Sequence, residues 1–144
     1  MTHEPLLGPV VALVAWSLVM LIWVMAARLP ALKKIGVDLS KHVGSRPGAL
    51  DGVVADRAQW KAHNYIHLME QPTLFYAIVF ALILMGQNFA INVWIAWTYV
   101  GLRVAHSIVQ ATWNRILVRL ILFGLSSLCL LALTLHAALG LLHG

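Results

Sequence analysis

Residues 63–76 read HNYIHLMEQPTLFY, and they place two histidines, an asparagine and a glutamate at the head of a long apolar run. After Glu70 the next charged residue is Arg103. About 20 predominantly apolar residues are enough for a helix to cross the hydrocarbon of a bilayer. The stretch therefore predicts a membrane-spanning helix that carries polar side chains at one end.

The composition of the whole chain supports a membrane protein. Its 144 residues are 61% hydrophobic and only 10% charged, whereas about a quarter of a soluble domain is charged. The mean hydropathy is +0.85. The length predicts one domain over residues 1–144. The net charge is +5, but the basic residues cluster in a few places, so we expect no nucleic-acid partner. The single Cys129 lies in an apolar run and is expected to be a packed, inert thiol.

Four apolar segments predict four transmembrane helices. Each is long enough to cross about 30 Å of hydrocarbon, and each is continuously apolar rather than alternating, which favours helices over barrel strands. The first is too long for a cleaved signal and lacks a basic start. The predicted fold is therefore an all-α four-transmembrane-helix bundle, with helices at about Leu6–Leu29, Ala58–Met85, Phe89–Ala111 and Arg115–Leu142.

The connections differ in charge. The segment from Pro30 to Arg57 holds five basic residues, the segment GQN at 86–88 signals an uncharged turn, and the third connection is followed by two arginines. Because basic connections stay in the cytoplasm, the first and third connections are expected there, with both termini outside. The basic residues concerned are Lys33, Lys34, Lys41, Arg46, Arg57, Arg115 and Arg119.

Polar residues recur at steps of three and four in the second and third segments. Such steps place side chains on one helix face, and charges inside a membrane usually face the bundle interior. Pro72 is expected to kink the second helix above this face. Together with Arg28 in the first segment and Arg115 and Arg119 in the fourth, the polar faces gather at one depth. They consist of His63, Asn64, His67, Glu70 and Gln71, and of Arg103, His106, Ser107, Gln110 and Asn114.

Three interpretations of this polar set stay open. Glu70 pairs with Arg103 to fix the bundle while Arg115 and Arg119 reach lipid phosphates. Alternatively, the excess of positive charge over a single carboxylate holds an anionic ligand that bears carboxylates. A metal site at His63, His67 and Glu70, completed by His106, is the third possibility. A His-x-x-x-His pair is common by chance and the arginines oppose a cation, so we expect no metal.

The stretch HNYIHLMEQPTLFY, followed by YVGLRVAHSIVQATWNRILVRLILF at 99–123, resembles a known family. This family is the membrane-associated proteins in eicosanoid and glutathione metabolism (MAPEG), which include microsomal glutathione transferases, prostaglandin E synthase and small bacterial members. The strongest blocks are the stretch from Glu70 to Pro72 and LRVAHS in the third segment. Arg119, thirteen residues beyond His106, keeps the family spacing.

The resemblance implies a left-handed four-helix bundle that forms a homotrimer in a bacterial inner membrane. It also implies glutathione as co-substrate, bound between neighbouring subunits near the cytoplasmic face. Glu70 would hold the glutathione amino end, and Arg103 and His106 would contribute to the polar core. Arg119 would point at the sulfur and favour the thiolate, which would attack a lipophilic electrophile from the bilayer.

The sequence departs from the family pattern in several places. His67 stands where the family prefers asparagine, and His63 and Lys61 partly replace basic residues that precede the glutamate. Hydroxyl-bearing positions of prostaglandin synthase-like members are taken by Leu120, Gln110 and Phe123.

Two functional hypotheses follow. The first is a trimeric membrane protein that binds glutathione or a similar thiol, and conjugates it to lipophilic electrophiles or reduces lipid peroxides. The second is a non-catalytic member, which binds lipid or serves as a structural subunit of a larger membrane complex. In the first hypothesis Arg119 is catalytic, and the ligand is held by Arg28, His63, Asn64, His67, Glu70, Arg103 and His106.

Overall fold

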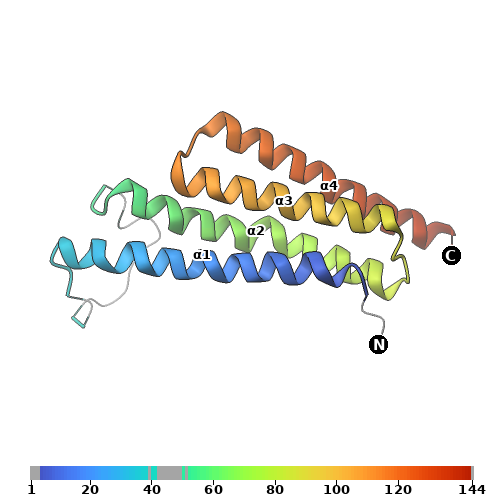
Figure 1. The fold of residues 1–144 in the computed structure, drawn as a ribbon, viewed down its shortest axis with the longest axis horizontal. Helices are drawn as coiled ribbons and strands as arrows, with labels where there is room; N and C mark the ends of the chain where they lie inside the picture. The colour runs from blue at the N-terminus through green and yellow to red at the C-terminus, as the bar shows by residue number, and fades with distance from the viewer. Residues whose placement is uncertain (1–3, 39, 42–49, 51, 144) are drawn as a thin grey trace.

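The computed structural model describes residues 4–38, 40–41, 50 and 52–143. This part of the chain contains four helices and no strand. The helices lie side by side as an elongated bundle, and both termini are at the same end (Figure 1). The protein is therefore an all-α four-helix bundle, as the sequence predicted. The helices are α1 (Leu7–Lys34), α2 (Asp56–Leu84), α3 (Ala90–Thr112) and α4 (Ile116–His143).

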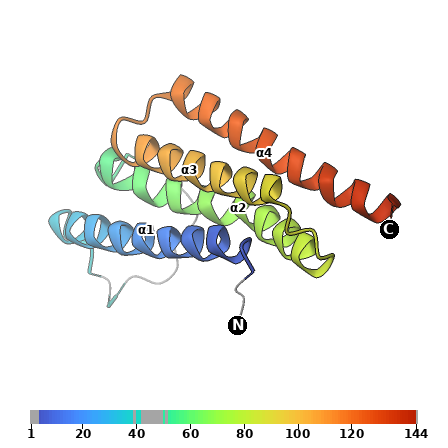
Figure 2. The same ribbon diagram turned by 45° about the vertical axis from the view of Figure 1, so that its right-hand side comes forward.

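Within the described residues, every pair of helices is in contact except α1 and α4. Figure 2 shows α1 and α4 on opposite sides of the bundle, with α2 and α3 between them. The end of the bundle away from the termini contains the ends of α1 and α3 and the starts of α2 and α4 (Figure 1). We call it the basic end, because Lys33, Lys34, Arg57 and Arg115 lie there.

Three of the four helices, α1, α2 and α4, are long and apolar enough to cross a membrane. The 23-residue α3 is not in this group. It carries five polar residues that are buried in the bundle rather than turned to its surface: Asn92, Arg103, His106, Ser107 and Gln110. Helix α3 lies along α2 and α4 (Figure 1). The structure thus supports three of the four predicted transmembrane helices by length and composition, and a span at α3 stays a prediction.

Helix α1 continues past Leu29, where the sequence pattern predicted its end. Pro30 lies inside the helix, which ends at Lys34. A proline removes only one backbone hydrogen bond, and the extra turn packs Leu32 against Val54 and Ala58. Gly36, two residues beyond Lys34, has a φ of 76° and terminates the helix. Gly36 N–H donates to Lys33 and Val37 N–H to Leu32, which is the Schellman arrangement of a helix end.

The turn between α2 and α3 is built in the same way. Gly86 has a φ of 68°, and the amides of Gly86 and Gln87 donate to the carbonyls of Ile83 and Leu82. The turn predicted at 86–88 is thus confirmed. Helix α2 itself continues through Pro72 to Leu84. Of the first connection, residues 39, 42–49 and 51, including the basic Arg46, lie outside the described residues.

The core joins apolar side chains from all four helices, with the ring of Phe75 stacked on that of Tyr99 at 4.3 Å between centroids. The outer surface is also apolar: on α4 alone, Leu117, Leu128 and Leu141 are more than half exposed. A soluble protein rarely leaves such a continuous apolar surface in water, so this surface fits contact with lipid.

A polar contact ties α3 to α4 near the termini. His136 Nδ1 lies 2.5 Å from Asn92 Oδ1, and Asn92 Nδ2 donates to the carbonyl of Gln87 at 3.0 Å. Asn92 is 1% exposed. Its side chain therefore bonds both to α4 and to the turn between α2 and α3.

Substituting Asn92→Leu is expected to lower the free energy of unfolding by about 1–3 kcal/mol, because it leaves the partners of the amide unsatisfied in a buried place. Unfolding in detergent, followed by circular dichroism, measures the change. Thr98→Val is the matched control: Thr98 is exposed on the same helix, and among the described residues its hydroxyl donates to the carbonyl of Trp94 in its own helix. Equal stability of Asn92→Leu and the control would contradict the expected role.

Candidate functional site

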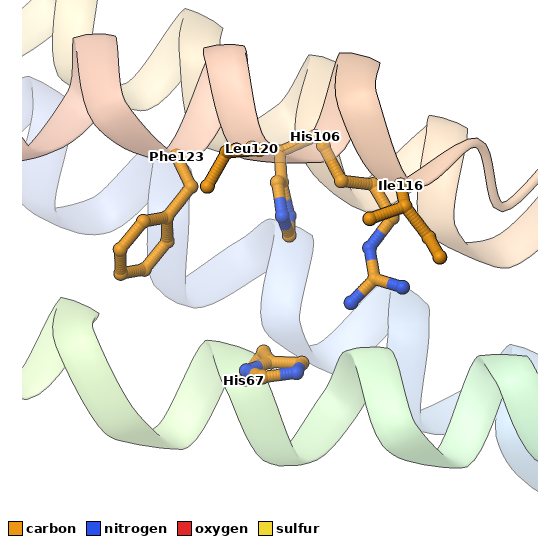
Figure 3. Close-up of a pocket in the computed structure, with 6 residues that line it drawn as sticks. His67, His106, Ile116, Leu120 and Phe123 are labelled. Carbon is orange, nitrogen blue, oxygen red and sulfur yellow. The ribbon is translucent and has the colours of Figure 1, made fainter.

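A cavity of about 440 Å³ opens between α2, α3 and α4 (Figure 3). We call it the histidine–arginine cavity. Three of its lining residues carry nitrogen-bearing side chains and three are apolar. Its lining residues are His67, His106, Ile116, Arg119, Leu120 and Phe123.

The two histidines reach the cavity from different helices. His67 lies on α2 and is partly exposed, whereas His106 on α3 is 4% exposed. Their ring centroids are 6.4 Å apart and the rings meet edge to face. Figure 3 shows His106 and Phe123 projecting toward the helix that carries His67. The spacing of three and four residues placed each histidine on an inward face, and packing of the helices brings the two faces together.

Arg119 supplies the fixed positive charge of the cavity. Its Nη1 donates to Asn114 Oδ1 at 2.7 Å. Asn114, two residues beyond the end of α3, has a φ of 52°, and its backbone N–H donates to the carbonyl of Val109. This turn therefore orients the guanidinium. Arg119 Nε is buried and has no hydrogen-bond partner among the described residues. A buried donor without a partner is unfavourable, so the guanidinium keeps capacity to bind a ligand.

Glu70 lies beside the cavity on the outer face of α2. Its Oε2 is 3.0 Å from His67 Nδ1, and the two side chains are 61% and 40% exposed. Among the described residues it makes no ion pair with Arg103. The interpretation of Glu70 and Arg103 as an interhelical pair therefore does not hold within one chain. A polar contact between side chains as exposed as those of His67 and Glu70 contributes little stability, which leaves the carboxylate available to another group.

Arg103 lies behind the cavity and is only 1% exposed. Its Nη2 donates to the carbonyl of His67 at 2.8 Å, and its Nη1 to Gln71 Oε1 at 3.4 Å. The guanidinium carbon is 5.9 Å from the centroid of the Phe123 ring. Arg103 thus supports two of the cavity's lining residues, His67 and Phe123, without lining the cavity itself.

Gln71 is the centre of a polar network that the sequence pattern placed on the right face but did not assign to the site. Besides Arg103, it contacts α4 through its Nε2, which donates to Ser127 Oγ at 2.7 Å. Ser126 Oγ and the Tyr99 hydroxyl donate to its Oε1 at 3.3 and 3.5 Å. The signal that could have found it is the Ser126–Ser127 pair in the mostly apolar middle of α4.

Besides Glu70 and Arg103, three more of the predicted ligand-binding residues do not line the cavity. Asn64 is 0% exposed and donates to Ser107 Oγ at 2.5 Å, so it joins α2 to α3 inside the bundle. His63 is exposed on α2, one turn nearer the basic end. Arg28 is partly exposed on α1, and its buried Nε has no hydrogen-bond partner in the described part of the chain.

The metal alternative gains no support from the structure. Within the described residues, no group of three or more His, Cys, Asp or Glu side chains could hold a metal ion. His63, His67 and Glu70 share a helix face, but the helix does not gather them around one point.

A sequence model of the MAPEG family matches residues 6–139. The chain belongs to the MAPEG family. No curated protein and no solved structure matches it. Membership supports a membrane protein of the glutathione-transferase-like kind in general terms. MAPEG proteins generally use glutathione, and they are often trimeric.

The three departures at hydroxyl-bearing positions fall into two groups. Leu120 and Phe123 line the histidine–arginine cavity, so two positions where MAPEG synthases place hydroxyls are apolar here. Gln110 is 2% exposed and does not line the cavity. The first two residues therefore affect the chemistry of the cavity directly, and Gln110 does not.

Proposed function

We propose that this MAPEG protein binds glutathione, or a closely similar thiol, at the histidine–arginine cavity and transfers it to lipophilic electrophiles. One observation carries the proposal: a single cavity unites His67, His106 and Arg119 from three helices. The unpaired Nε of Arg119 supplies a donor for an anion. Glutathione is an anionic ligand with two carboxylates and a thiol, which suits this excess of positive charge.

Arg119 acts by stabilising the thiolate. A guanidinium beside a thiol lowers the thiol pKa from roughly 8.5 toward neutrality, because the positive charge favours the anion. The thiol proton passes to solvent, and the sulfur forms a new bond to the electrophilic carbon while a leaving group such as halide departs with its electron pair. With a lipid hydroperoxide as acceptor, two molecules of glutathione become the disulfide and the peroxide becomes an alcohol and water.

The apolar lining residues provide the route for the second substrate. Ile116 and Leu120 are 78% and 64% exposed on the outer surface of α4. They border both the cavity and the surface that fits contact with lipid. A lipophilic electrophile dissolved in the bilayer therefore reaches the thiolate without entering water.

Glutathione is held between the subunits of a homotrimer in this proposal. Glu70 is on the outer face of one chain, and its carboxylate suits the glutathione amino group. Arg28 and His63 do not line the cavity of their own chain. In this proposal they contact the glutathione that is bound in the cavity of a neighbouring subunit. The clustering of Lys33, Lys34, Arg57 and Arg115 supports a cytoplasmic position of the basic end in a bacterial inner membrane, with both termini outside.

The test is conjugation of a model aryl halide by the purified full chain. The proposal expects a glutathione-dependent rate above that of the same mixture without protein. No rate above the buffer reaction, with protein that is folded and in lipid, would refute the enzymatic part of the proposal.

A second candidate function is a non-catalytic one, in which the chain binds lipid or serves as a subunit of a larger membrane complex. Ile116, Leu120 and Phe123 favour it, because they make half of the cavity lining apolar and leave Arg119 without a hydroxyl to assist it. Absence of conjugation, together with lipid recovered from this cavity or a co-purifying membrane protein, would support this candidate.

A further inference from the structure

A second cavity, of about 660 Å³, lies at the basic end of the bundle. The start of α2, the end of α3 and the start of α4 form it, and it shares no lining residue with the histidine–arginine cavity. We call it the tryptophan–arginine cavity. Its lining residues are Arg57, Trp60, Thr112, Trp113, Arg115 and Val118.

Two guanidinium groups face this cavity from separate segments. Arg57 belongs to the first turn of α2 and Arg115 directly precedes α4. Within the described residues, neither makes an ion pair. Lys61 adds a third positive charge nearby: its Nζ donates to the carbonyls of Arg57 and Ala111 at 2.8 and 3.3 Å, and so ties α2 to the end of α3.

The carboxylate nearest in sequence is Asp56, in the first turn of α2. Within the described residues near the cavity, this one acidic residue stands beside three basic ones, which leaves a net positive charge around the tryptophan–arginine cavity. Guanidinium groups bind phosphate through paired hydrogen bonds of matching geometry. The chemistry of the cavity therefore favours a phosphate-bearing anion.

The surroundings distinguish a lipid from a soluble anion. Trp113 is 77% exposed at the basic end, and tryptophan prefers the level of the lipid headgroups. Val118 lines the cavity, and Leu117 and Ile121 continue an exposed apolar surface along α4 toward the middle of the bundle. A ligand with a phosphate at the cavity and hydrocarbon along α4 would satisfy both surfaces.

We propose that the tryptophan–arginine cavity binds the phosphate headgroup of an anionic phospholipid, whose acyl chains lie along the exposed face of α4. Arg57 and Arg115 hold the phosphate from two sides, and Trp60 and Trp113 set the depth of the headgroup. Because α2 and α4 both contribute, the bound lipid links the starts of these helices. The site is independent of glutathione and of any catalytic activity.

Native mass spectrometry of the delipidated full chain, titrated with phosphatidylglycerol or phosphatidylcholine in detergent, tests the proposal. We expect the wild type to prefer phosphatidylglycerol by on the order of tenfold. Each basic residue near an anionic lipid surface strengthens binding by a factor of about this order. Arg57→Gln with Arg115→Gln removes the preference, and Arg115→Gln alone removes part of it. Both side chains are exposed, so these changes leave the fold intact.

The matched control is Lys33→Gln with Lys34→Gln, which removes the same charge at the same end of the bundle from exposed positions on α1. This control is expected to keep the preference. Equal loss in both double variants would reduce the effect to general surface charge and overturn the site. Displacement of phosphatidylglycerol by millimolar inorganic phosphate would also overturn it, since the ligand would then be a soluble anion.

Discussion

Arg119→Ala is expected to lower kcat/KM for glutathione conjugation by on the order of 10²–10³-fold. Removing one preorganised donor that faces a developing anion has an effect of this size in other enzymes. The reason lies in the cavity: Arg119 is the only side chain with a fixed positive charge among its lining residues. The initial rate of aryl halide conjugation, measured at glutathione concentrations well below KM, gives kcat/KM for each variant.

The matched control for this prediction is Arg115→Ala. Arg115 lies four residues earlier and has the same charge, but it lines the tryptophan–arginine cavity. It is expected to retain conjugation within about threefold of the wild type. Arg119→Lys keeps the charge but loses the fork that contacts Asn114, so an intermediate rate is expected. If both alanine variants lost activity equally, general charge near the membrane would explain the result and Arg119 would have no specific role.

The second large effect is on stability. Gln71→Leu is expected to destabilise the bundle by about 1–3 kcal/mol or more, because it takes one acceptor from a buried guanidinium and leaves Ser127 without its donor. The change also removes the contact that links α2, α3 and α4 behind the cavity. Unfolding of the purified protein in detergent, monitored by circular dichroism, measures the loss.

A double-mutant cycle of Gln71→Leu with Arg103→Leu measures the coupling energy of the two polar side chains apart from the packing lost in each single variant. Arg103 donates to both His67 and Gln71, so removing the buried charge also removes the need for the amide acceptor. The double variant is expected to be less destabilised than the sum of the two single variants. Additive changes would show that Gln71 and Arg103 are not coupled.

The helical periodicity of polar residues predicted much of the arrangement. Steps of three and four placed His67 and His106 on inward faces, the family resemblance pointed to Arg119, and the structure brings these three to one cavity. The turn at Gly86 was predictable because only glycine readily adopts its positive φ. The end of α1 was not, because Leu32 gains contacts with Val54 and Ala58 that lie beyond the reach of a local pattern.

Partner choice within the polar faces could not be predicted. A stripe at steps of three and four is broad, and its two edges face different neighbours. Asn64, on one edge, is taken up by Ser107 of α3, whereas Glu70, on the other, faces outward. Gln71 meets α4 because of the helix packing, which no single helix sequence reveals. The predicted ligand role of Arg28 depends on a neighbouring chain, and so it stays a prediction.

Isothermal titration of glutathione into the purified protein, in the wild-type form and as Glu70→Gln, tests the central claim most directly. Glu70→Gln keeps the shape of the side chain and removes its charge, so it isolates recognition of the glutathione amino group. The account predicts saturable binding to the wild type and an affinity lower by on the order of tenfold in the variant. No saturable binding, or equal affinity in the two proteins, would contradict it.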